Sequence, residues 1–172
     1  MTTFAALGTP KALADTRTAQ GIVEPFPIQV KTLPDTLAGR DVLGRGRTGS
    51  GKTIAFAIPL VARLAEREAK HFRKPGRPMG LVLAPTRELA SQVAEHLAEL
   101  AAHTNVRVAT VFGGVGAGPQ EKAFRKGVDV IVYEPELEED TFFGSTVCRD
   151  LEAFKESADL IEVAFKLREL EV

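Results

Sequence analysis

The sequence contains very little cysteine and no long hydrophobic run. Cys148 is the single cysteine among 172 residues, so the chain can form neither an internal disulfide nor a zinc site built from several cysteines. No stretch approaches the length of a membrane-spanning helix. The first seven residues, Met1 to Leu7, lack the basic start and long apolar segment of a secretory signal. We therefore expect a cytoplasmic protein with no membrane association.

Net charge is also nearly absent, at −1, but the charge is unevenly divided along the chain. Residues 1–133 carry 18 basic and 11 acidic side chains, a charge of +7, whereas residues 134–172 carry 4 and 12, a charge of −8. The first part could therefore meet a polyanion, which the tail would repel. Because 44% of the residues are hydrophobic, the chain is able to bury one sizeable core.

The glycine-rich stretch from Gly46 to Thr53 matches the pattern G-x-x-x-x-G-K-[ST] at every fixed position. A short apolar run at Asp41–Leu43 predicts a strand before it, and apolar spacing beyond it predicts a helix from Lys52 to about Ala65. Such a loop directs backbone N–H groups at a polyphosphate, as in ATP. In this role Lys52 reaches the β- and γ-phosphates and Thr53 ligates Mg²⁺; the alternative is a plain glycine-rich turn. The predicted phosphate-binding residues are Arg47, Thr48, Gly49, Ser50, Gly51, Lys52 and Thr53, of which Lys52 and Thr53 are also the catalytic candidates.

Two prolines punctuate the segment Gly21–Gln29, which precedes a predicted helix over Ile28–Leu37. The Gln29 side chain presents one acceptor and two donors on a planar amide, which match the donor and acceptor edge of adenine. A glutamine at the start of a helix is also commonly a capping or solvated residue. The sequence alone leaves both interpretations open.

Beyond the glycine-rich stretch, strands and helices alternate. Apolar runs predict strands at Leu81–Ala84, Val106–Phe112 and Val128–Val132, separated by a helix from Pro85 to about Ala102, with Thr86 as its N-cap, and by a short helix over Gln120–Lys126. Glu66–Met79 is predicted to be a solvated loop, with contact to a nucleic-acid backbone as the alternative. This alternation predicts a mainly parallel sheet covered on both faces, with ligands at the carboxyl ends of its strands.

Over about residues 4–133, the chain resembles the DEAD-box ATP-dependent RNA helicases. The resemblance rests on an isolated aromatic, Phe4, 17 residues before Gly21, on the segment ending in Ile28-Gln29, on the glycine-rich loop, on Pro85-Thr86-Arg87-Glu88-Leu89-Ala90 and on Gly113-Gly114. Ile22 and Phe26 depart from the aromatic and the threonine of the family pattern. The resemblance implies a RecA-like P-loop NTPase fold, a three-layer α/β/α architecture that uses ATP, Mg²⁺ and RNA. It implies that Phe4 stacks on the adenine, that Gln29 reads its edge, and that Pro85, Thr86, Arg87, Glu88, Gly113 and Gly114 bind RNA.

The resemblance fails beyond Val132. The sequence contains no Asp-Glu-Ala-Asp run, whose carboxylates in this family hold Mg²⁺ and orient the attacking water, and Glu134 at a strand end is only a weak substitute. We therefore expect residues 1–133 to be an incomplete helicase ATP-binding domain with weak or no hydrolysis. Unwinding would need a second RecA-like domain. The alternative is a non-catalytic nucleotide-binding or regulatory module whose acidic tail masks the RNA-binding face.

The tail, residues 134–172, carries two conflicting patterns. Apolar residues at helical spacing favour a helix over about Arg149–Leu170, whereas alternation favours a strand over about Leu160–Leu167. Such a strand would fill the place beside the phosphate-loop strand where the missing strand of the family would lie. The acidic run Glu134–Asp140 is predicted to be a solvated loop, with mimicry of RNA phosphates as the alternative.

Overall fold

The computed structural model describes residues 2–70, 78–111, 122, 125–133, 141–142, 145–146 and 162–163. The chain divides into two compact units, one formed by Met1–Phe72 with Glu95–Val106 and the other by Arg73–Ala94 with Arg107–Val172. The predicted boundary after residue 133 stays a prediction. Within the part of the chain just given, no helix is long and apolar enough to cross a membrane.

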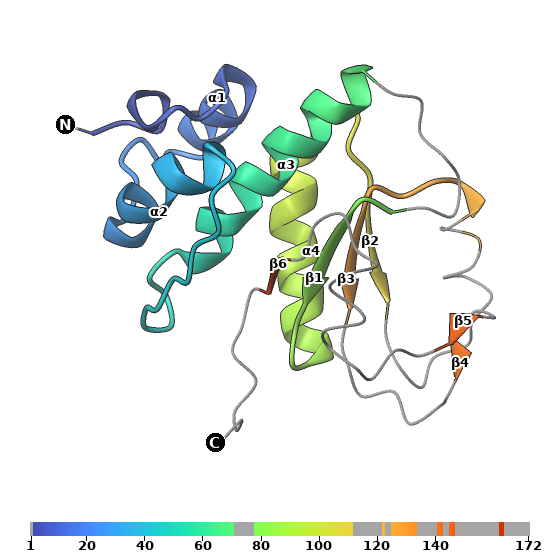
Figure 1. Ribbon diagram of the computed structural model, residues 1–172. Helices are drawn as coiled ribbons and strands as arrows, with labels where there is room; N and C mark the ends of the chain where they lie inside the picture. The colour runs from blue at the N-terminus through green and yellow to red at the C-terminus, as the bar shows by residue number, and fades with distance from the viewer. Residues whose placement is uncertain are drawn as a thin grey trace. The chain divides into compact units, whose positions relative to one another are not determined.

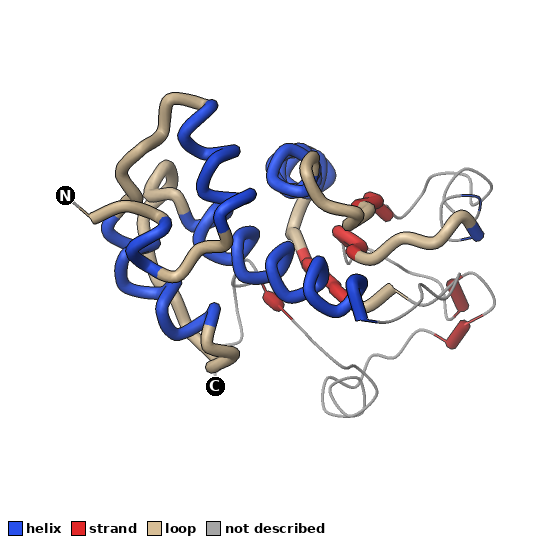
Figure 2. Tube along the Cα trace, turned by 90° about the horizontal axis from the view of Figure 1, so that it is seen from above, coloured by secondary structure: helices blue, strands red, loops and turns tan. Residues whose placement is uncertain are grey.

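The first unit is built from helices (Figures 1 and 2). A 3₁₀ turn, η1, spans Ala5–Leu7 and is followed by α1 at Lys11–Ala19, α2 at Pro27–Leu37 and α3 at Lys52–Lys70. The predicted helix at Ile28 is confirmed; it begins one residue earlier because proline is favoured in the first helical position. The predicted loop from Glu66 is wrong as far as Lys70, since this stretch of good helix formers extends α3.

Helices α2 and α3 pack against each other and form the centre of this unit. Leu33 of α2 is fully buried, as are Ile58, Leu60 and Val61 of α3. Ile58 and Val61 lie with Ile54 and Leu64 on the stripe that the apolar period predicted, and Leu60 is buried on a different side of the helix. Burial of each such side chain contributes about 1.5–3 kcal/mol to folding. The packed pair α2 and α3 therefore holds both ends of the segment that connects them.

The connecting segment, residues 40–47, forms neither a helix nor a strand, so the predicted strand at Asp41–Leu43 is wrong. The side chains of Val42 and Leu43 are exposed, at 37% and 101%. A run with only two apolar residues becomes a strand only where a neighbouring strand pairs with its backbone, and none does so here among the described residues. The segment runs close to α2 instead: a β-carbon at Gly44 would lie 3.7 Å from Ile28 Cδ1 and 3.8 Å from Thr32 Cγ2.

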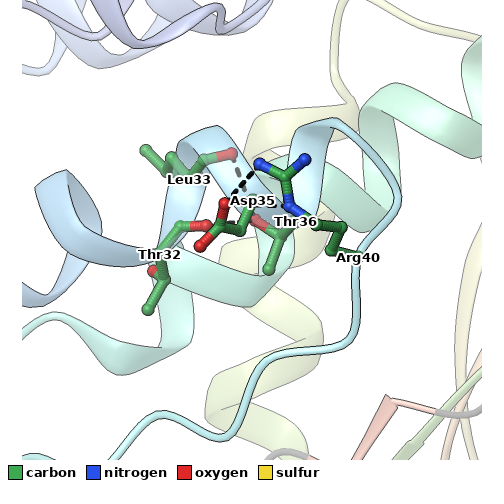
Figure 3. A network of polar contacts seen from close by, with 5 residues as sticks. All are labelled: Thr32, Leu33, Asp35, Thr36 and Arg40. Carbon is green, nitrogen blue, oxygen red and sulfur yellow. Dashed lines mark hydrogen bonds and ion pairs between the residues drawn. The ribbon is translucent and has the colours of Figure 1, made fainter.

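Arg40 attaches the start of this segment to the end of α2, as Figure 3 shows. Its Nε donates to Asp35 Oδ1 at 3.0 Å, Nη2 reaches the same oxygen, and its backbone N–H donates to the carbonyl of Asp35 at 3.0 Å. The hydroxyl of Thr36 donates to the carbonyls of Thr32 and Leu33 in the preceding turn, at 3.0 and 3.3 Å. Because the ion pair is about half exposed, it contributes no more than about 1 kcal/mol, and its main effect is to fix the direction of the chain.

The second unit contains a parallel sheet with the strand order β2-β3-β1-β6. Its strands are β1 at Gly80–Leu83, β2 at Val108–Val111, β3 at Val130–Tyr133 and β6 at Glu162–Val163 (Figure 1). Helix α4, Arg87–Ala101, connects β1 to β2, and a separate antiparallel pair joins β4, Thr141–Phe142, to β5, Ser145–Thr146. The predicted strands at 81–84, 106–112 and 128–132 are thus confirmed with shifted ends.

Asp129 ties together the amino ends of three strands. Its carboxylate Oδ2 accepts a hydrogen bond from the Arg107 backbone N–H at 2.8 Å, just before β2. Its own carbonyl accepts from the backbone N–H groups of Met79 and Gly80 at 3.0 and 2.8 Å, where β1 begins. The side chain is buried, with 1% exposure. One residue at the start of β3 therefore sets the register of both neighbouring strands.

The tail contributes a strand rather than a helix where the structure describes it. Glu162 and Val163 pair in parallel with Val82 and Leu83 of β1, so the favoured helix is wrong at these two residues and the alternative strand is correct. An unpaired β1 edge offers backbone groups that a passing segment can satisfy, which explains the choice. The neighbour of β6 is β1 and not the expected phosphate-loop strand, since that segment forms no strand. The rest of the tail, including the acidic run at 134–140, lies outside the described residues.

The predicted short helix at Gln120–Lys126 and the predicted N-cap of α4 both agree with the structure where it describes them. Lys122 and Arg125 are helical, and the Lys126 N–H donates to the Lys122 carbonyl at 3.2 Å, in agreement with the short helix predicted there. Thr86 caps α4 as predicted, because its hydroxyl accepts a hydrogen bond from the Leu89 N–H at 3.3 Å.

Candidate nucleotide-binding site

The glycine-rich loop lies directly before the first turn of α3. Gly49 and Gly51 adopt φ angles of +78° and +83°, which side chains other than glycine rarely adopt. The Ser50 N–H donates to the Arg47 carbonyl at 3.2 Å and closes a turn, and the Gly51 carbonyl accepts the first helical bond from Ala55. The loop thus delivers its backbone to the amino end of a helix, the end that attracts anions.

Lys52, the first residue of α3, reaches back across this loop. Its Nζ donates to the carbonyl oxygens of Gly46 at 2.6 Å and Arg47 at 2.8 Å. The ammonium group therefore holds the two sides of the loop together through main-chain acceptors. An ammonium group has three donors, so one remains for a further acceptor in this arrangement.

Gln29 joins helix α2 to the same loop. The side chain is completely buried, its Oε1 accepts from the Phe26 N–H at 2.8 Å, and its Nε2 donates to the Gly51 carbonyl at 3.0 Å. The capping interpretation of Gln29 is thereby confirmed, because the amide satisfies an orphan donor at the start of α2. Each amide atom retains one further hydrogen-bonding position, so the reading of adenine by Gln29 stays a prediction.

Phe26 is a contact that the sequence analysis missed. A β-carbon at Gly51 would lie 2.9 Å from Phe26 Cδ2 and 2.5 Å from Gln29 Nε2, so the ring and the amide both lie against the loop backbone. The ring nevertheless remains 47% exposed. The one sequence signal was the helix start itself, since a glutamine at the third helical position points back at the residue before the helix.

Ser50 and Gly46 show that the loop suits a polyphosphate. The Ser50 hydroxyl is buried and has no hydrogen-bond partner, which is costly unless a further group satisfies it. A β-carbon at Gly46 would lie 2.6 Å from this hydroxyl oxygen, so only glycine leaves the hydroxyl its place. An unsatisfied hydroxyl beside a helix amino end and an ammonium group fits an anion with several acceptor oxygens.

The loop region offers one candidate ligand for a metal ion. Thr53, in the first turn of α3, is half buried and offers a hydroxyl. Within the described ranges there is no group of three or more His, Cys, Asp or Glu side chains that could hold a metal ion. Thr53 as a Mg²⁺ ligand therefore stays a prediction.

Phe4 occupies an enclosed position. Its ring is 2% exposed, and the guanidinium carbon of Arg17 lies 6.0 Å from the ring centroid. Arg17 Nη1 donates to Gln20 Oε1 at 2.5 Å, and Gln20 Nε2 donates to Glu99 Oε2 at 3.0 Å. Burial lowers the pKa of the Arg17 guanidinium below its usual value, and the charge of Glu99 opposes this shift. Both faces of the Phe4 ring are therefore covered, and the stacking of Phe4 on adenine stays a prediction.

The predicted RNA-binding residues belong to the second unit. Pro85, Thr86, Arg87 and Glu88 follow the carboxyl end of β1 and begin α4, and all but the half-buried Pro85 are exposed. Gly113 and Gly114 lie outside the described residues. The four residues after β1 stand where parallel sheets bind ligands, and their contact with RNA stays a prediction.

A parallel sheet with a G-x-x-x-x-G-K-[ST] loop at a helix start defines the class of phosphate-binding-loop α/β proteins. The sequence profile of the DEAD/DEAH box helicases matches residues 26–159. A chloroplastic DEAD-box ATP-dependent RNA helicase 3B of Zea mays is 44% identical over 133 residues, covering 77% of this chain and 18% of the relative. The ATP-dependent RNA helicase SrmB of Escherichia coli is 40% identical over 132 residues, covering 77% and 29%. This chain belongs to the DEAD/DEAH box helicase family.

Solved structures agree with this assignment. The RNA helicase Prp28 of Chaetomium thermophilum, determined with ADP, matches at a TM-score of 0.70 with 36% identity over 78% of this chain and 32% of that one. A DEAD box protein of Methanococcus jannaschii matches at 0.64 with 30% identity over 77% and 34%. The α/β fold is thus that of the RecA-like domains of these helicases, as the sequence predicted. The chain spans 18 and 29% of the length of the two curated relatives given above.

Proposed function

We propose that this chain is the ATP- and RNA-binding N-terminal RecA-like domain of a DEAD-box RNA helicase. One observation supports this most. Gln29, the candidate for reading adenine, donates a hydrogen bond to the Gly51 carbonyl of the same loop that Lys52 closes by bonding to the Gly46 carbonyl. ATP is the nucleotide that this set of groups suits, and RNA would bind at Pro85, Thr86, Arg87 and Glu88 with Gly113 and Gly114. The cytoplasmic location remains our expectation, although the maize relative is named as chloroplastic.

The loop residues would hold the phosphates of the nucleotide. Lys52 would exchange its carbonyl acceptors for phosphate oxygens, and the Ser50 hydroxyl would gain the partner that it lacks. The N–H groups from Arg47 to Lys52 and the amino end of α3 would add their dipoles. Thr53 would ligate Mg²⁺, which, when bound, neutralises charge on the phosphates.

Hydrolysis is expected to be weak or undetectable in this chain alone. The sequence has no Asp-Glu-Ala-Asp run to hold the metal and orient water, and a second RecA-like domain would be needed for unwinding. The alternative is a non-catalytic module whose acidic tail covers the RNA face, which the charges of +7 and −8 on the two parts of the sequence favour. RNA-stimulated phosphate release separates the two: release that disappears with Lys52→Ala indicates an ATPase, and nucleotide binding without release indicates the module.

Replacing Lys52 with alanine should largely remove the stabilisation that ADP gives to the protein. Bound ligand at 100 times its Kd stabilises by about 2.7 kcal/mol. A charge-assisted contact contributes roughly 1.5–3 kcal/mol, so the variant should lose most of this effect. The measurement is the melting temperature with and without ADP. The matched control is Lys11→Ala, which removes an exposed lysine paired with Asp15; equal ADP-induced shifts in both variants would contradict the proposal.

A further inference from the structure

An adenine base needs two things from its site: an accessible flat apolar surface on which to stack and polar groups that meet its edge. Gln29 is completely buried, so its amide can meet the base only through the hydrogen-bonding positions that Phe26 and Gly51 leave open; this inference rests on the proposed function and concerns the stacking surface. The family resemblance assigns the flat surface to Phe4. The structure offers a second aromatic ring, Phe26, and the two rings differ in accessibility: Phe4 is 2% exposed and Phe26 is 47% exposed.

Phe4 is enclosed by contacts that hold its cover in place. The Arg17 guanidinium lies over the ring, is itself only 5% exposed, and is held by Gln20, which in turn is held by Glu99. A base could reach the ring only after this chain of contacts had been broken and a buried cation had moved. Phe4 therefore has the environment of a core residue.

Phe26 combines exposure with a fixed backbone. It lies between Pro25 and Pro27, and its φ and ψ of −65° and 157° are those that a following proline favours. Its N–H is held by Gln29 Oε1 at 2.8 Å. A ring on so restricted a backbone loses little conformational freedom when a ligand stacks on it.

The position of Phe26 is the second observation. A β-carbon at Gly51 would lie 2.9 Å from Phe26 Cδ2 and 3.3 Å from Phe26 Cβ, and 2.5 Å from Gln29 Nε2. The exposed ring and the amide thus both lie against the phosphate loop at Gly51. We propose that Phe26, in place of Phe4, is the ring on which the adenine base of a bound nucleotide stacks.

The test compares ADP with inorganic pyrophosphate, which engages the phosphate loop but has no base. Phe26→Ala should weaken ADP binding about tenfold, the loss expected for one base–aromatic stack, and should leave pyrophosphate binding unchanged in calorimetric titrations of the full chain. Phe26→Tyr, which keeps the ring, should bind ADP as the unaltered protein does. Phe4→Leu should leave the ratio of the ADP affinity to the pyrophosphate affinity unchanged.

A fluorescence measurement keeps the proposal testable if Phe26→Ala does not fold. The sequence has no tryptophan, so Phe26→Trp introduces a single reporter. ADP should quench or shift its emission, and pyrophosphate should not. Equal effects of Phe26→Ala on both ligands, or a selective loss of ADP binding in Phe4→Leu, would overturn the inference. If the unaltered chain binds neither ligand, the proposed function itself fails, which is a distinguishable result.

Discussion

Replacing Gly51 with alanine should destabilise the protein by about 2–5 kcal/mol and abolish nucleotide-induced stabilisation. At a φ of +83°, a β-carbon costs roughly 1–2 kcal/mol by itself. It would also lie 2.5 Å from Gln29 Nε2, so the buried amide must give up its bond to the Gly51 carbonyl, a further loss of about 1–3 kcal/mol. Thermal unfolding with and without ADP measures both effects.

Gly49→Ala is the matched control for this substitution. Gly49 has nearly the same φ, +78°, but a β-carbon there would have no atom within 4 Å among those compared. It should therefore cost only the backbone strain, about 1–2 kcal/mol, and leave the contact of Gln29 with the loop intact. If both variants lose equal stability, the contact between Gln29 and Gly51 makes no measurable contribution.

Asp129→Ala should destabilise the second unit by about 2–4 kcal/mol, because it removes a charged acceptor from a part-buried backbone N–H. The Arg107 N–H, just before β2, would lose its hydrogen-bond partner. Asp129 itself is only 1% exposed, so water does not easily replace the lost carboxylate. Circular dichroism during urea unfolding measures the change in stability.

Asp129→Asn separates the acceptor from the charge. Asparagine keeps a carbonyl oxygen that can accept from Arg107, so this variant should recover most of the stability lost in Asp129→Ala. An asparagine variant as unstable as the alanine variant would show that the carboxylate charge, rather than the hydrogen bond to Arg107, stabilises the strand ends.

Local patterns predicted the helices that have an apolar stripe and the loop that precedes α3. Fixed glycines and a lysine at set spacing carry their conformational requirement in the sequence itself, so the loop could be recognised without a structure. Helix α2 could be predicted because Pro27 and Gln29 mark its start. The strands β1, β2 and β3 were predicted from buried apolar runs, with ends shifted by one or two residues.

Elements whose state depends on distant partners could not be predicted. Helix α1 buries Thr16 and Arg17 along with Leu13 and Ala14, so its inner face lacks the apolar period that reveals a helix. The run at Asp41–Leu43 resembles a strand, but pairing depends on which neighbours are available. At Glu162–Val163 the local patterns offered both a helix and a strand, and the edge of β1, which pairs with β6, decides between them.

The contacts of the candidate site were the least predictable part. The bond between Gln29 and Gly51 joins residues separated by 22 positions, and the Lys52 ammonium bonds to main-chain carbonyls, which carry no signature in the sequence. The covered ring of Phe4 and the exposed ring of Phe26 are both phenylalanines, so composition could not distinguish them.

The engagement of Lys52 with the carbonyls of Gly46 and Arg47 has a consequence for the affinity of any anion that the loop binds. A phosphate that binds this loop would not meet a free ammonium group. It would compete with the two carbonyl oxygens that already accept hydrogen bonds from Lys52. Binding of a phosphate would then be an exchange of hydrogen-bond partners, and its affinity would report the difference between the two sets of bonds that the ammonium group makes.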